Sequence, residues 1–362
     1  MRKIPKPDNK KKQIDILVIL LFSLLAFILI KTGFSKKTKD LMENMRQASQ
    51  LMYNSVEAVS SCYKDKGLII DKKRDVNQTG FIGLERSSIT TSLGSLLAKR
   101  TSIDPNFAGF FVYLLKQAGV RQGNTVAAGV SGSFPGLIVA FLAAADVLDL
   151  NVRMICSLGA SQWGANRPDF HWIDMLDCLR EKEVISVQPI AFSLGGERDI
   201  GVDMDPAGRN LFEERLIRIK VPFIREESLA ENVALRMRLY KGSVDEHKIA
   251  AFIHIGGSWA NMGTDSSVLD LRPGLIRIKT FPAPEKQGVI HAMAAKKIPV
   301  IHCLFLRGLV MRYGLTWDPV PLSLPGEGGL YDHVRERRPF FLYIAGVYLI
   351  CVFVFLYIRG RK

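Results

Sequence analysis

Residues 125–148 read TVAAGVSGSFPGLIVAFLAAADVL and contain the pattern that decides the fold. The segment 125–130 is short and apolar, which is typical of a buried strand. Small residues at 131–133 make a tight turn, and the apolar run 134–148 is long enough for a helix. A strand followed at once by a helix is the first half of a βαβ unit, in which a helix joins two parallel strands.

The same alternation continues on both sides of this segment. Further strands are expected at 152–158, 184–192, 250–255 and 300–306, and further helices at 104–119, 168–179, 212–219, 228–241 and 287–296. The expected strands are mostly apolar and do not alternate between apolar and polar residues, which fits burial on both faces. The sequence therefore predicts an α/β domain over 81–310, with a mostly parallel, Rossmann-like open sheet and helices on both faces.

Apolar stretches also lie near the two ends of the chain, at 14–34 and 339–358. A helix needs about 20 mostly apolar residues to cross the hydrocarbon core of a bilayer. The second stretch contains no Asp, Glu, Lys, Arg or His. We therefore expect one transmembrane helix at each end of the chain. A cleaved signal peptide is the alternative for the first stretch, and a buried core helix is the alternative for the second.

The expected organisation follows from these segments. It comprises a basic tail at 1–13, a transmembrane helix at 14–34, a helical stalk and linker at 35–80, the α/β domain at 81–310, a linker at 311–338, a transmembrane helix at 339–358 and a basic tail at 359–362. Basic flanks prefer the cytoplasmic side of a membrane. The six basic residues before Ile14 therefore favour an inner-membrane protein with both termini in the cytoplasm and the domain outside.

The net charge of the chain is +14 at pH 7, and much of the excess lies in the two end segments, where it would meet anionic lipid. A modest positive bias in the remainder would favour an anionic polymer. No segment resembles a nucleic-acid-binding module, and we expect no cofactor. The five cysteines lack CxxC or Cys/His metal spacing, so the sequence predicts neither a metal site nor a particular disulfide.

Four of the expected strands end in loops of glycine, serine and other small residues, at 129–133, 157–164, 193–197 and 256–261. In open parallel sheets, ligands bind beyond the carboxyl ends of the strands. Glycine lets the backbone approach a ligand closely. We therefore predict a binding site where these loops meet.

The loop at 129–133 is similar to the turn on which some hydrolases place a nucleophilic serine. That motif reads Gly-x-Ser-x-Gly, whereas Ser133 occupies the fifth position here. In this interpretation Ser131 is the nucleophile and either His171 or His254 is its base. The alternatives are that Ser133 caps the following helix while Ser131 binds backbone, or that the loop binds an anion without chemistry.

Two of the loops have similar sequences, each with a serine, a tryptophan and then an asparagine. Tryptophan offers a flat surface to a ligand, and asparagine offers both a donor and an acceptor. The alternative is that each tryptophan closes one end of the core. The predicted ligand-binding residues of these loops and their neighbours are Gly129, Ser133, Ser161, Trp163, Asn166, Gly257, Ser258, Trp259 and Asn261.

The segment 195–205 is rich in acidic residues, with Glu197, Asp199, Asp203 and Asp205. Their oxygens suit a divalent cation, but the spacing is not that of a calcium loop. A solvated loop is the favoured interpretation, and no metal ligands are predicted here.

The motifs GVSGSFP at 129–135, SLGASQWGAN at 157–166, GGERD at 195–199 and GGSWAN at 256–261 together resemble those of the bacterial poly-gamma-glutamate system protein. The resemblance covers about 80–310 and the apolar segments on either side. It implies a role in the bacterial cell envelope, in biosynthesis of an anionic capsule polymer that is made at the membrane and exported. It implies no catalytic residues.

These observations lead us to expect a membrane-anchored accessory protein of poly-gamma-glutamate biosynthesis or export. It would bind polymer, precursor or a synthase partner at the strand-end crevice. One alternative is a serine-dependent amide hydrolase or transferase that acts on gamma-glutamyl bonds, and another is a structural scaffold of the synthase complex. The expected partners are membrane lipid, poly-gamma-glutamate synthase components and an anionic polymer or glutamyl ligand.

Overall fold

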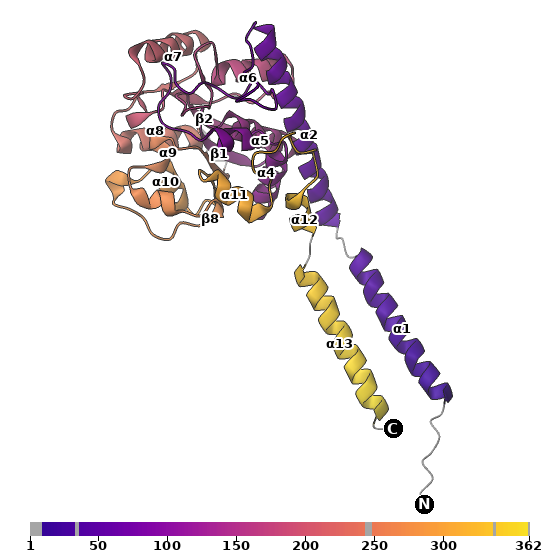
Figure 1. Ribbon diagram of the computed structural model, residues 1–362. Coiled ribbons are helices and arrows are strands. Elements are labelled where there is room, and N and C mark those ends of the chain that lie inside the picture. Colours follow the sequence, from indigo (N-terminus) through magenta and orange to yellow (C-terminus); the bar gives the residue numbers. More distant parts are fainter. Residues whose placement is uncertain (1–8, 33–35, 243–247, 336–337, 361–362) are drawn as a thin grey trace, which may run out of the picture. The chain divides into compact units, whose positions relative to one another are not determined.

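The computed structural model describes residues 9–32, 36–242, 248–335 and 338–360, and Figure 1 shows its ribbon with part of the helices and strands labelled. The chain divides into two compact units. One unit consists of the two ends of the chain, up to Asp40 and from Asp332 onward, and the other runs from Leu41 to Tyr331. The second unit contains the sheet and the candidate site.

A seven-stranded sheet forms the centre of the second unit, with strand order β6-β5-β2-β1-β7-β9-β8. The strands are β1 (Thr125–Ser131), β2 (Asn151–Ser157), β5 (Ala191–Ser193), β6 (Phe223–Ile224), β7 (Ile249–Ile255), β8 (Gly274–Ile276) and β9 (Val300–Cys303). Every neighbouring pair is parallel except β8 with β9. The predicted α/β fold with a mostly parallel, Rossmann-like sheet is confirmed.

The connections between the strands reverse direction beside β1. From β1 the chain proceeds through β2 and β5 to β6, and it then returns to β7 on the other side of β1. Parallel connections are almost always right-handed, so the helices before and after this reversal cover opposite faces of the sheet. The first group is α5 (Pro135–Val147), α6 (Trp172–Glu181) and α7 (Pro206–Ile219), and the second is α8 (Leu229–Lys241) and α10 (Val289–Ala295).

The apolar core lies on both faces of this sheet. Tyr240 of α8 and Met293 of α10 belong to one buried cluster with Phe252 of β7. On the other face, α4 (Asn106–Gln117) packs against α5, with the rings of Phe111 and Phe141 5.8 Å apart in an edge-to-face arrangement. Side chains of this size each contribute about 1.5–3 kcal/mol when they are removed from water.

Helix α2 (Lys36–Asp65) lies in the segment predicted as a helical stalk, and one face of it is buried. Met45, Met52 and Val59 recur every seven residues along it and are completely buried, because they form the apolar face of an amphipathic helix. From Leu41 onward its residues belong to the same compact unit as the sheet. A disulfide joins Cys62 of α2 to Cys178 of α6, a pairing that the cysteine spacing did not reveal.

Shorter elements connect these layers. They are α3 (Leu96–Thr101), α9 (Trp259–Met262), α11 (Leu306–Tyr313), α12 (Gly329–Arg335), a two-stranded sheet of β3 (Asn166–Arg167) and β4 (Phe170–His171), and three 3-10 turns, η1 (Glu197–Asp199), η2 (Ser266–Asp270) and η3 (Pro284–Lys286).

The terminal unit pairs α1 (Asn9–Thr32) with α13 (Arg338–Gly360). The hydroxyls of Ser23 and Tyr348 are 2.8 Å apart, and Arg359 Nε donates to Asp15 Oδ1 at 2.7 Å.

Among the described residues, no helix has both the length and the apolar content required to cross a membrane. A crossing takes about 20 mostly apolar residues in one helix. This finding contradicts the transmembrane helices predicted at 14–34 and 339–358. It also contradicts the predicted location of the chain in the inner membrane, with two spans and with both termini in the cytoplasm.

Candidate functional site

A cavity of about 420 Å³ lies at the carboxyl edge of the sheet, where the strand order reverses between β1 and β7. Loops that follow β1, β2, β5 and β7 all contribute to its wall, and we call it the strand-edge cavity. Six of the predicted site residues line it: Ser131, Ser133, Ser161, Gly257, Ser258 and Trp259. Such a crevice is the usual ligand site of an open parallel sheet.

Ser131, the predicted nucleophile, is bonded within its own turn. Its hydroxyl accepts from the backbone N–H of Ser133 at 3.2 Å and donates to the hydroxyl of Ser133 at 3.1 Å. None of the hydrogen bonds among the described residues joins Ser131 to a histidine. Ser133 does not cap α5 with its side chain, because the N-terminal capping residue is Phe134.

His171, one of the two predicted bases, lies at the start of α6 rather than in the wall of the strand-edge cavity. Its Nδ1 is 3.2 Å from Asp174 Oδ2, and its ring meets Phe212 edge to face at 5.2 Å. Burial lowers the pKa of His171 to about 4 despite the nearby carboxylate. The neutral ring therefore serves helix packing.

His254, the other predicted base, lies within β7 below the cavity. Its ring stacks on that of His302 with centroids 5.0 Å apart, and the two Nδ1 atoms are 2.9 Å apart. Burial, with His302 and His291 close by, lowers the pKa of His254 well below the ordinary value. A base that resists protonation so strongly is a poor acceptor for a serine proton near neutral pH.

Gly129 and Asn261, both predicted to bind ligand, are packed against each other beneath the cavity. A Cβ atom at Gly129 would lie 2.5 Å from Asn261 Oδ1, so only glycine fits there. Asn261 is completely buried, and neither polar atom of its side chain has a hydrogen-bond partner among the described residues. The glycine at this position is therefore explained by the close approach of α9 to β1.

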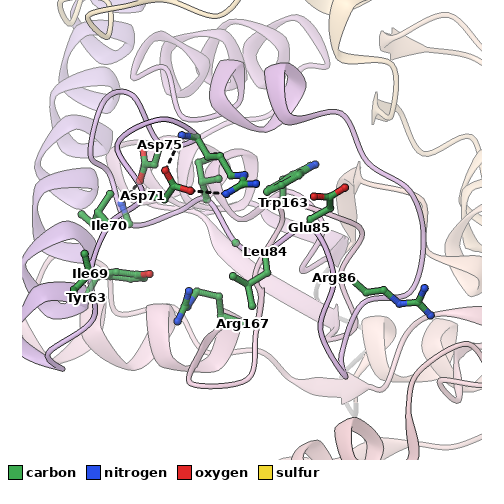
Figure 2. Close-up of a pocket in the computed structure, with 14 residues that line it drawn as sticks. Tyr63, Ile69, Ile70, Asp71, Asp75, Leu84, Glu85, Arg86, Trp163 and Arg167 are labelled. Atoms are coloured by element: carbon green, nitrogen blue, oxygen red, sulfur yellow. Dashed lines mark hydrogen bonds and ion pairs between the residues drawn. The ribbon is translucent and has the colours of Figure 1, made fainter.

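Asn166 and Trp163 also lie outside the strand-edge cavity. The amide of Asn166 is used by the backbone, since Nδ2 donates to Leu84 O at 2.8 Å and Oδ1 accepts from Leu84 N at 2.8 Å. Trp163 lines a second cavity of about 260 Å³ together with Tyr63 and Arg167, as Figure 2 shows. The guanidinium carbon of Arg74 lies 5.2 Å from the centroid of the Trp163 ring.

The acidic segment after β5 is divided between the floor and the wall of the strand-edge cavity. Asp199 is completely buried and pairs with Arg236, while its Oδ1 accepts from Ser157 and Ser193 at 3.1 and 2.8 Å. Glu197 and Asp203 line the cavity wall and are exposed. Within the described part of the chain, no group of three or more His, Cys, Asp or Glu is arranged to hold a metal ion.

Lys99 was not identified from the sequence, and its side chain contacts the wall of the strand-edge cavity. It projects from α3, is only 3% exposed, and donates to the hydroxyl of Ser161 at 2.8 Å and to the backbone oxygen of Ser133. Its Nζ lies 3.6 Å from the centroid of the Phe134 ring. Burial alone lowers the pKa of Lys99 to about 7. A lone lysine 62 positions before its serine carries no recognisable sequence signal.

Comparison of the chain with protein-family models, with curated proteins and with solved structures gives no match. The findings thus supply no support for an assignment to poly-gamma-glutamate production, and the resemblance of the motifs remains a prediction. The fold and the cavity define a Rossmann-like α/β protein with a hydroxyl-lined site at the carboxyl edge of its sheet.

Proposed function

We propose that this protein binds a small polar ligand of the amino-acid type in the strand-edge cavity. The observation that carries the proposal is the convergence of four serine hydroxyls at the reversal point of the sheet. They come from the end of β1 and from the loops after β1, β2 and β7. They belong to Ser131, Ser133, Ser161 and Ser258. Cavities with a few convergent polar groups at this point of a parallel sheet are the usual ligand sites of the architecture.

The chemistry of the wall defines the ligand class. Serine hydroxyls both donate and accept, so they suit a carbonyl or a carboxylate. Glu197 and Asp203, on another part of the wall, suit an ammonium group. Trp259 adds a flat apolar surface for an aliphatic chain. A ligand with an ammonium group, a short aliphatic chain and an amide or carboxylate matches all three features.

Gamma-glutamyl compounds belong to this class, and they are the ligands that the motif resemblance implies. We therefore propose an accessory role in poly-gamma-glutamate production. In this role the strand-edge cavity binds a precursor or the end of the polymer. A structural scaffold for a synthase complex would need no ligand in this cavity, so ligand binding separates the two functions.

The test is calorimetric titration of the whole protein with L-glutamate and with gamma-L-glutamyl-L-glutamate. Replacing Glu197 by Gln removes one charge from the cavity wall, and we expect binding to weaken about tenfold, as for loss of one charge-assisted hydrogen bond. Glu214→Gln, at an exposed ion pair on α7, is the matched control and should bind as the parent does. Absence of binding by the parent, or equal affinities of the two variants, contradicts the proposal.

A further inference from the structure

Lys99 and Ser161 form a contact that ligand binding alone does not require. A buried lysine is normally paired with a carboxylate, because an unpaired charge in the interior is costly. None of the ion pairs among the described residues includes Lys99, and its polar contacts are a serine hydroxyl and a backbone carbonyl. The arrangement therefore favours an uncharged amine.

We propose that Ser161 is the nucleophile and Lys99 the general base of an acyl-transfer reaction in the strand-edge cavity. The acyl donors are esters or amides. The inference rests on the proposed function, since it assigns a reaction to the ligand bound there. An activated serine needs a base within hydrogen-bond reach, and the 2.8 Å separation of Nζ and Oγ meets that condition.

In the ammonium form Lys99 directs its three N–H groups at Ser161 Oγ, at the carbonyl of Ser133 and at the face of the Phe134 ring. The neutral form is the one that can act as a base. A neutral amine has two N–H groups and one lone pair. One N–H donates to the carbonyl of Ser133, and the other can point to the face of the Phe134 ring, whose centroid is 3.6 Å away. Loss of the proton that Nζ directs at Ser161 leaves a lone pair 2.8 Å from Oγ, in position to accept the hydroxyl proton of that serine. The pKa of about 7 that burial gives Lys99 leaves a large neutral fraction at physiological pH.

Ser133 holds both partners in position. Its carbonyl oxygen accepts from Lys99 Nζ, and its hydroxyl accepts from the backbone N–H of Ser161 at 3.0 Å. Ser133 is itself fixed by the turn after β1 through its contacts with Ser131. The pair is therefore held by the rigid carboxyl end of a central strand, as a preorganised site requires.

The reaction balances with water as the second reactant. Ser161 Oγ attacks the carbonyl carbon while its proton moves to Lys99 Nζ, and the carbonyl electron pair moves onto oxygen. Collapse of this intermediate breaks the bond to the leaving alcohol or amine, which takes the proton from Lys99. Water, deprotonated by Lys99, then attacks the acyl-serine. Collapse of this second intermediate breaks the bond to Ser161 Oγ, which takes the proton back from Lys99, and the acid is released. General base catalysis of this kind contributes about 10²–10⁴-fold to rate.

An alkyl fluorophosphonate probes the pair directly. Attack by Ser161 forms a P–O bond and expels fluoride, while the serine proton passes to Lys99. We expect one phosphonyl adduct, mapped to Ser161 by peptide mass spectrometry. Its rate of formation should rise with pH through about 7, as Lys99 loses its proton. This profile is measured on the unaltered protein, so it stands even where a substitution at the buried lysine prevents folding.

Variants complete the test. Ser161→Ala should abolish labelling, and Lys99→Met should slow it at least 100-fold. Glu214→Gln, at the exposed ion pair on α7, is the control and should still be labelled at Ser161. An adduct on Ser131 or Ser258 in place of Ser161, or a rate that does not change between pH 6 and 8, overturns the inference. Absence of any adduct while gamma-L-glutamyl-L-glutamate still binds overturns the catalytic pair alone, whereas loss of both overturns the proposed function as well.

Discussion

Arg236 Nη2 lies 2.6 Å from Asp199 Oδ2, and both side chains are completely buried. The same carboxylate accepts hydrogen bonds from Ser157 at the end of β2 and Ser193 at the end of β5. Ser157 in turn is 3.0 Å from the hydroxyl of Ser258 on the cavity wall. The ion pair therefore ties the loop after β5 to the carboxyl ends of two strands and forms the floor beneath the strand-edge cavity.

Removal of Arg236 should be strongly destabilising, because it leaves the carboxylate of Asp199 buried without its charged partner. We expect Arg236→Met to lower the free energy of unfolding by about 3–5 kcal/mol, measured by urea denaturation. Glu227→Gln breaks the exposed pair between Arg198 and Glu227, and as the control it should change stability by less than about 0.5 kcal/mol. Equal effects of the two substitutions would show that the buried pair does not hold the floor.

The contact between Gly129 and Asn261 should appear as strong coupling in a double-mutant cycle. A Cβ at Gly129 would lie 2.5 Å from Asn261 Oδ1, so we expect Gly129→Ala to cost about 1–3 kcal/mol through overpacking. In an Asn261→Ala background the new methyl group has space, and the same change should be close to neutral. Additive effects of the two substitutions on the urea midpoint would contradict this packing.

The disulfide between Cys62 and Cys178 should contribute substantially to stability, because its cysteines are 116 positions apart. Closing a loop of about 100 residues lowers the entropy of the unfolded chain by an amount worth about 4–5 kcal/mol. We expect dithiothreitol to lower the unfolding temperature of the parent protein. Cys178→Ala should unfold at that lower temperature with or without the reductant. A parent that is unaffected by the reductant would show that the bond does not form.

Acidification from pH 6.5 to 5 should destabilise the protein through its buried histidines. Burial lowers the pKa of His171 and of His302 to about 4, and that of His254 also falls. Below pH 6.5 the unfolded chain therefore binds more protons at these three histidines than the native state does, and their contribution to stability falls as pH falls.

Each of these histidines contributes up to about 1.4 kcal/mol per pH unit. Unfolding curves at half-unit intervals measure the slope, and His171→Phe should reduce it by one histidine's share. A slope that His171→Phe leaves unchanged would contradict the neutral state of the His171 ring.

The centre of the fold follows from local sequence, whereas its edges do not. β1 and β7 are continuous apolar runs that end in glycine-containing turns, so both were predicted within one or two residues. The edge strands β6 and β8 have two and three residues. They form only because a neighbouring strand supplies their hydrogen bonds. The local sequence of a short segment does not predict such pairing.

The candidate site was predicted in part for a similar reason. Residues predicted in the loops directly after β1 and β7 line the cavity, because the carboxyl ends of parallel strands meet at one edge of the sheet. Trp163 does not line this cavity, although its loop resembles that of Trp259. Trp163 stands two positions after its serine rather than one, and its backbone has a positive φ of 63°. Lys99 reaches the site from α3 through tertiary packing, which sequence spacing does not encode.

The most direct test of the account compares Trp259→Ala with Trp163→Ala in calorimetric titration with gamma-L-glutamyl-L-glutamate. Trp259 lines the strand-edge cavity, and Trp163 lines the second cavity. We predict that Trp259→Ala weakens binding at least tenfold, which is about 1.4 kcal/mol, while Trp163→Ala binds as the parent does. Loss of binding in Trp163→Ala with parental affinity in Trp259→Ala would place the ligand elsewhere and contradict the account.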